Sequence, residues 1–150
     1  NFIHMGGSGA VYRIGESDFC VKILNDGNFY ASGRASNNCQ LENENYISAK
    51  AYDAGVSVPE PRGIVGIRHP DHGNFVPGFV MEYIPAVENP SLWQIAKLKA
   101  NHWRELRKAR KAGVIIEDSY SKYHRHNLIL SVKNKRWYLI DFGNWKEAKK

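Results

Sequence analysis

A charged residue inside an apolar strand pattern constrains the fold of this chain more than any other feature. The runs "GAVYRI" and "DFCVKIL" are separated by "GES", which predicts a β-hairpin. Along the second run the faces alternate, so Lys22 shares one face with Cys20 and Leu24. Burying a lysine is costly unless it is paired. Lys22 is therefore expected either to extend to the surface or to meet a carboxylate.

Glu44 is the candidate carboxylate. The segment "LENENYISAKAYDAG" has a helical pattern that Gly55 would end. Glu44 stands three residues before Ile47 and seven before Ala51, so it falls on their face of the helix, whereas Glu42 is rotated away. We expect an ion pair between Lys22 and Glu44. The alternative is that Glu44 is a solvated residue near the helix N-terminus, where the dipole favours it.

The remaining patterns predict an α+β chain. The polar stretch 25–38 is predicted to be a loop, "VSVPEPRGIVGI" to be extended, and "GFVMEYI" to be a short strand. Residues 91–112 have a helical pattern, and "NLILSVKNKRWYLIDFG" reads as a second hairpin with "KNK" at its turn. One apolar stripe of the second helix consists of Ala96, Ala100, Trp103, Leu106 and Ala109.

Composition excludes some classes of protein. The 150 residues are 43% hydrophobic and 12% aromatic, which argues against disorder. No apolar run approaches the ~18 residues of a membrane span, and no signal-peptide pattern opens the sequence. Cys20 and Cys39 have no metal-site spacing and are expected to be ordinary thiols of an intracellular protein.

The chain carries a net charge of +6, and six of the ten residues 102–111 are His, Lys or Arg. This basic helix is compatible with nucleic acid or an acidic protein surface as partner. A solvated helix face has the same composition, and no recognised RNA-binding motif accompanies it.

The Gly-rich turn "HMGGSGAVY" lies between two strand-like runs. Glycines let backbone N–H groups approach and wrap an anion such as a phosphate. No Gly-Lys-Ser/Thr follows, so this is not a Walker loop. A plain hairpin turn is the competing interpretation.

In their order, these elements resemble the protein-kinase superfamily. "GGSGAV" looks like its Gly-rich loop, with His4 in place of the first glycine, and "FCVK" looks like the strand that carries the phosphate-binding lysine. "ENYISAKAYDAGVSVPEP" is similar to the RIO-type and related atypical kinases, and "FVMEYI" to the strand that links the two lobes. The resemblance implies that the nucleotide meets Gly6, Gly7, Ser8, Gly9, Val11, Cys20, Lys22, Glu82 and Tyr83.

The resemblance extends to the catalytic and metal-binding loops. "IDFG" looks like the family's DFG element, which implies that Asp141, together with Asn127 of "NLIL", binds Mg²⁺. The register of "GVIIED" puts Asp118 at the position of the catalytic aspartate. Asp118 is followed by an eight-residue gap before Asn127, where the family has four. Counting back from Asn127 puts Lys122 there instead, and a centre that uses His124 or His126 also stays open.

Together, the resemblance implies an α+β protein-kinase-like two-lobe fold over residues 1–150. Residues 1–85 would form a β-rich N-lobe with one helix, and 86–150 a reduced helical C-lobe. Only seven residues follow Gly143, where a full kinase carries its activation segment, so a minimal or atypical member, or a truncated piece of one, is expected.

The expected activity is that of an atypical serine/threonine kinase that uses ATP and Mg²⁺, similar to RIO-type, Bud-type and small bacterial-effector kinases. Lys22, held by Glu44, would act on the phosphates, and a protein would be the acceptor. The alternatives are a pseudokinase that binds nucleotide or partners, and a nucleic-acid-associated scaffold. No membrane partner is expected; the compartment is the cytoplasm, with a secreted effector as the alternative.

Overall fold

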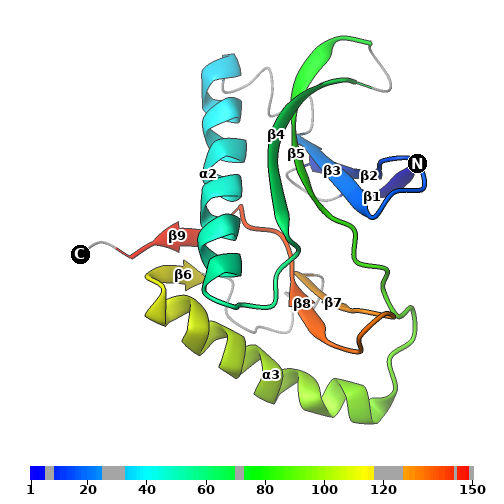
Figure 1. Cartoon of the computed structure of the whole chain (residues 1–150), viewed down its shortest axis with the longest axis vertical. Coiled ribbons are helices and arrows are strands. Elements are labelled where there is room, and N and C mark those ends of the chain that lie inside the picture. The colour runs from blue at the N-terminus through cyan, green and yellow to red at the C-terminus, as the bar shows by residue number, and fades with distance from the viewer. Residues whose placement is uncertain (6–8, 25–32, 70–72, 117–126, 144, 149–150) are drawn as a thin grey trace. The chain divides into compact units, whose positions relative to one another are not determined.

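The computed structural model describes residues 1–5, 9–24, 33–69, 73–116, 127–143 and 145–148, and it is mixed α+β, as predicted (Figure 1). The chain divides into two compact units. The first consists of Asn1–Tyr46 and Glu60–Tyr83, and the second of Ile47–Pro59 and Ile84–Lys150. The division at residue 85 stays a prediction; in the structure, Ile47–Pro59 belongs to the second unit.

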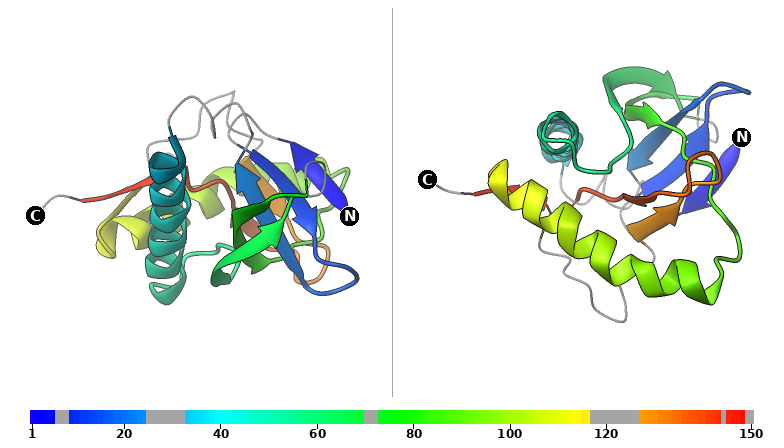
Figure 2. Two further views of the ribbon diagram at one scale, coloured as in Figure 1. Left: turned by 90° about the horizontal axis from the view of Figure 1, so that it is seen from above. Right: turned by 60° about the horizontal axis from the view of Figure 1, so that its bottom comes forward.

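An antiparallel sheet of five strands forms most of the first unit, in the order β1-β2-β3-β5-β4 (Figures 1 and 2). The predicted hairpin is confirmed, because Ala10 pairs with Ile23 and Val11 with Lys22. Gly15 in its turn has φ 56°, a conformation that glycine adopts without strain. The strands are β1 Phe2–Met5, β2 Gly9–Arg13, β3 Phe19–Leu24, β4 Pro61–Arg68 and β5 Phe75–Glu82.

The central strand β3 is buried on both faces, from Cys20 to Leu24. Two glycines let its neighbours approach. A Cβ on Gly9 would lie 2.3 Å from the carbonyl oxygen of Ile23, and one on Gly78 would lie 2.6 Å from Cγ2 of Val21. The glycine at position 9 is therefore required by backbone packing, whatever else the Gly-rich turn does.

Helix α2 spans Gly33–Asp53 and buries Leu41, Glu44, Ile47, Ser48 and Ala51. Gly55 ends it as predicted, with φ 71° and its amide donating to the Tyr52 carbonyl at 2.8 Å. The predicted loop over 25–38 is wrong for residues 33–38, which are helical, whereas 25–32 lie outside the described residues. Adding turns to an established helix costs little, so the packed later turns outweigh the weak propensities of this polar stretch.

The second unit contains α3 Leu92–Lys111 and two small antiparallel sheets. Ser91 and Gln94 form a capping box at the start of α3. β7 Leu128–Leu130 and β8 Trp137–Leu139 form the predicted hairpin, and β6 Val114–Ile116 pairs with β9 Trp145–Glu147, a strand that the sequence patterns do not predict. The buried rings of Phe142 and Trp145 meet edge to face, 4.8 Å apart.

The apolar stripe of the second predicted helix is split in the structure. Leu106 and Ala109 are buried, but Ala96, Ala100 and Trp103 are exposed. Leu98, His102 and Glu105 are the buried side chains instead. Two polar side chains thus lie inside while a tryptophan lies outside. No helix of the described ranges is both long and apolar enough to cross a membrane.

We expect Gly9→Ala to lower the free energy of unfolding by about 2 kcal/mol, because the new methyl group would clash with the backbone of β3. Gly66→Ala is the matched control in the same sheet, since a Cβ there meets nothing within 4 Å. Urea unfolding of both variants measures the difference. Equal stabilities would contradict the close approach of β2 and β3.

Candidate functional site

Lys22 and Glu44 form a buried ion pair in the first unit, as predicted. The Lys22 Nζ lies 3.0 Å from Oε1 and 2.8 Å from Oε2 of Glu44. The two side chains are 8% and 0% exposed. The amide of Gln40, one turn earlier on α2, donates to Glu44 Oε1 at 3.4 Å.

Such a pair is poorly explained by stability alone. Removing two charges from water is expensive, and an apolar pair of similar volume is often as stable or more stable. Lys22 lies in the middle of the sheet, opposite Val11 on one side and Phe79 on the other, where an apolar residue would fit the pattern. A fixed cation at such a place is typical of functional sites.

The residues around the Lys22 strand have defined surroundings. Gly6, Gly7 and Ser8 lie outside the described residues, whereas Val11 pairs directly with Lys22. The Cys20 thiol donates to the Glu82 carbonyl oxygen at 3.7 Å. Burial, with the added effect of the Glu82 charge, raises the pKa of Cys20 to about 12. Cys20 therefore stays protonated and does not act as a nucleophile.

The predicted linker strand uses its amide hydrogens internally. The Glu82 amide donates to the Glu60 carbonyl at 2.9 Å, and the Tyr83 amide to the Asp18 carbonyl at 2.8 Å. The Arg13 guanidinium lies 4.7 Å from the centre of the Tyr83 ring. A nucleobase that bound here would have to hydrogen-bond to carbonyl groups of this strand, or to displace the Asp18 carbonyl from the Tyr83 amide.

In the second unit, the predicted metal-binding residues come together through the β7–β8 hairpin. Its pairing continues one step beyond the strands, because the Ile140 amide donates to the Asn127 carbonyl at 2.9 Å. Asp141 follows at once, is exposed, and has φ 64°. Aspartate tolerates this left-handed conformation better than most residues, but at a cost in free energy. The backbone pairing of Asn127 with Ile140 thus brings Asn127 close to an exposed carboxylate of a kind that suits a cation.

Mg²⁺ bound together with phosphate needs only one or two protein carboxylates, with water and phosphate oxygens completing its shell. The side chains of Asn127 and Asp141 carry oxygen atoms of the kind that such an ion binds. Within the described ranges, no group of three or more His, Cys, Asp or Glu side chains forms a metal cluster. Asp118, Lys122, His124 and His126, the candidates for the catalytic position, all lie outside those ranges.

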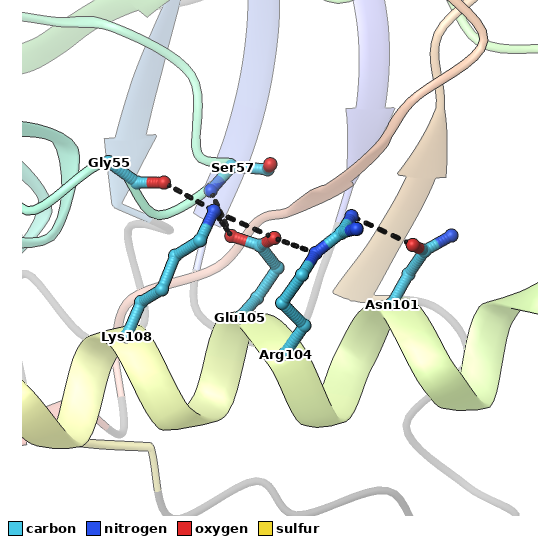
Figure 3. A network of polar contacts seen from close by, with 6 residues as sticks. All are labelled: Gly55, Ser57, Asn101, Arg104, Glu105 and Lys108. Atoms are coloured by element: carbon cyan, nitrogen blue, oxygen red, sulfur yellow. Dashed lines mark hydrogen bonds and ion pairs between the residues drawn. The ribbon is translucent and has the colours of Figure 1, made fainter.

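Glu105 is the centre of a polar network that the sequence analysis missed (Figure 3). Its carboxylate accepts from the Ser57 amide at 2.8 Å, from Lys108 Nζ at 3.1 Å, and from Arg104 Nε at 3.2 Å. Lys108 also donates to the Gly55 carbonyl at 2.8 Å. The network joins α3 to the segment after α2. The spacing of Glu105 and Lys108 signals a helical ion pair, but only the fold shows that the carboxylate is buried.

Burial by itself would raise the pKa of Glu105, yet the donors from Ser57, Lys108 and Arg104 outweigh it and hold the pKa below its ordinary value. Burial lowers the pKa of His102, so this histidine does not add to the charge of the helix at neutral pH. The exposed cations of the basic helix are Arg104, Arg107, Arg110 and Lys111.

No protein-family model matches the sequence, and a search of curated proteins finds no match.

We expect Lys22→Met to lower the free energy of unfolding by about 3–5 kcal/mol, because it leaves Glu44 buried without its cation. The double variant Lys22→Met with Glu44→Leu should recover most of that loss, since both charges are then gone. Urea unfolding of wild type, Lys22→Met and the double variant measures the loss of stability and its recovery. A double variant as unstable as Lys22→Met alone would show that packing, rather than charge, dominates at this position.

Glu105→Gln should destabilise the protein by about 2 kcal/mol at pH 7, because the donors to the carboxylate lose a charged acceptor. A lowered native pKa stabilises the fold above the ordinary pKa of about 4.5, and this contribution disappears as the pH falls through the native value. The stability difference between wild type and variant should therefore shrink on acidification. Glu42→Gln, at an exposed position on α2, is the control. Its stability should differ little from that of wild type, both at pH 7 and after acidification.

Proposed function

We propose that the chain is a Mg²⁺- and ATP-dependent phosphotransferase with a protein-kinase-like two-lobe fold, an atypical serine/threonine protein kinase. The single observation that carries the proposal is the buried ion pair of Lys22 on β3 with Glu44 on α2. An ammonium fixed by a carboxylate is poised to neutralise the phosphates of a nucleotide, which is the task of this pair in kinases.

The order of elements supports the proposal. A Gly-rich turn precedes β2, the lysine strand and the glutamate helix follow, and two further strands complete the sheet of the first unit. The second unit has one long helix and then a hairpin that ends at Asp141. This agrees with a β-rich N-lobe with one helix and a reduced helical C-lobe, the architecture that the resemblance implies.

Each residue has a role in the proposed reaction. Backbone N–H groups of Gly6, Gly7 and Gly9 would approach the phosphates, and Lys22 would bind the α- and β-phosphates. Asn127 and Asp141 would hold Mg²⁺, which neutralises charge on the phosphates when bound. Asp118 would orient the hydroxyl group of the acceptor. Catalysis would come from positioning and charge stabilisation.

The acceptor is expected to be a serine or threonine hydroxyl on a protein, because the resemblance is to protein kinases. Use of ATP would put the activity inside a cell, either the chain's own or, for an effector, that of a host. Nucleic acid is not part of the proposal, because no recognised RNA-binding motif accompanies the exposed cations of α3.

Mg²⁺ and ATP together should raise the melting temperature of the protein, because a ligand that binds only the native state stabilises it. With Asp141→Asn, at least tenfold more ligand should be needed to give the same Mg²⁺-dependent shift. Asparagine also adopts φ near 64°, so this substitution removes the charge and keeps the backbone. Asp53→Asn, at an exposed aspartate of the same unit, is the matched control. Absence of any shift at millimolar nucleotide would count against the proposal.

Transfer of labelled phosphate from ATP tests the chemistry separately. Asp118→Asn should abolish transfer and leave the thermal shift nearly intact, because Asp118 would act on the acceptor rather than on ATP. Lys122→Ala should have a moderate effect at most. Full activity of Asp118→Asn would overturn the assignment of Asp118. Binding without transfer in every protein tested would make the chain a pseudokinase.

A further inference from the structure

The outward face of α3 is apolar over its first three turns and basic over its last turns. Leu92, Trp93 and Trp103 are 86%, 67% and 56% exposed. Ala96 and Ala100 between them are also exposed, as are Arg107 and Arg110 further along the helix. Two solvent-exposed tryptophans on one helix face are unusual for a surface that meets only water.

These residues form one straight seam. The outward positions are separated by three and four residues in alternation, which is the spacing of a coiled-coil contact line. Along this line large, small, small and large side chains follow one another, and two arginines come next. The α3 seam consists of Trp93, Ala96, Ala100, Trp103, Arg107 and Arg110.

We propose that a second copy of this chain covers the seam, with the two α3 helices antiparallel. The apolar part is symmetric about position 98. Trp93 and Trp103 lie five residues on either side of this position, and Ala96 and Ala100 lie two residues on either side of it. An antiparallel copy therefore places tryptophan against tryptophan at both ends and alanine against alanine in the middle. Such a self-complementary contact is what a two-fold dimer requires.

The charges select the antiparallel direction. A parallel pair would set Arg107 against Arg107 and Arg110 against Arg110 of the other copy. In the antiparallel pair these arginines lie beyond the apolar overlap, at opposite ends of the contact, so the like charges of the two copies are kept apart.

The alanines in the middle of the seam set how close the helices come. Two alanine methyl groups let the backbones approach, so that the tryptophans at either end can pack across the contact. Lys97 Nζ lies 3.3 Å from the centre of the Trp93 ring, which fixes that side chain before association. Less conformational entropy is then lost when the dimer forms.

The contact is small. Burying two tryptophans, a leucine and their surroundings from each copy gives a total of roughly 1,000 Å², at the lower end for specific interfaces. We therefore expect a dimer with micromolar affinity. Because each copy carries a charge of +6 and lysines flank the seam, added salt should strengthen the dimer by screening repulsion.

Sedimentation velocity of the 150-residue chain from 1 to 500 µM tests the proposal. Wild type should shift from monomer to dimer, and more so in 0.5 M than in 0.1 M NaCl. Trp93→Ala and Trp103→Ala should each weaken association at least tenfold. Phe75→Ala, which removes a 74% exposed aromatic ring from the other unit, should leave it unchanged. Circular dichroism checks that every variant is folded.

Cysteine cross-linking tests the direction with conservative substitutions, in a background where the exposed Cys39 is replaced by serine. Position 96 of one copy faces position 100 of the other, so a mixture of Ala96→Cys and Ala100→Cys chains should form disulfide dimers several-fold faster than either alone. Self-cross-linking of each single variant as fast as the mixture would indicate a parallel pair and overturn the proposal.

Three further outcomes would also overturn it. One is a monomer throughout the concentration range. Another is association that salt abolishes, which would indicate an electrostatic contact such as one with nucleic acid or an acidic helix. The third is equal loss of the dimer in Phe75→Ala, which would indicate unspecific apolar association. The proposal does not depend on nucleotide binding, and it holds or fails independently of the phosphotransferase activity.

Discussion

The ion pair between Lys22 and Glu44 fixes the arrangement of the first unit. Strand β3 is central in its sheet, and the side chains of a strand alternate between faces, so a shift of one residue would move Lys22 to the wrong face. The same shift would leave the Glu44 carboxylate buried without a cation. The pair therefore excludes alternative registers of β3 with respect to α2 more strongly than apolar packing alone would.

Helix α2 carries ion pairs in both units. Glu44 belongs to the first unit, whereas Lys50 belongs to the second, where it pairs with Glu147 on β9. Strand β9 follows Asp141 and Gly143 in the sequence, and the buried rings of Phe142 and Trp145 meet edge to face. Glu44 and Lys50 are six residues apart on one uninterrupted helix, about 9 Å along its axis. Each of the two charged residues thus pairs within its own unit.

Periodicity explains which features were predictable from the sequence. The alternation along β3 and the helical spacing of Glu44 with Ile47 predict a pair that the structure confirms, because both residues are placed by strong local patterns. The same reasoning did not identify the inner face of α3. Both faces of that helix have helical periodicity, and only the donors from Ser57 and the helix itself make it favourable to bury Glu105 rather than Trp103. Strand β9 has only three residues, and its pairing with β6 is a long-range contact with no local signal.

A residue that the packing of the fold does not require points to a function, whereas a residue that packing explains does not. Gly9 suits a phosphate-binding turn, but the close approach of the β3 backbone explains it without any ligand. Lys22 and Glu44 differ, because packing would be served as well by two apolar side chains. Asp141 differs in the same way, since most hairpins end without a non-glycine residue at φ 64°. Packing requires neither the buried charge pair nor the left-handed aspartate, and such features are found mainly where a charge must be held for a ligand. Support for the proposed function is therefore strongest at Lys22, Glu44 and Asp141, and weakest at Gly9, whose turn first suggests it.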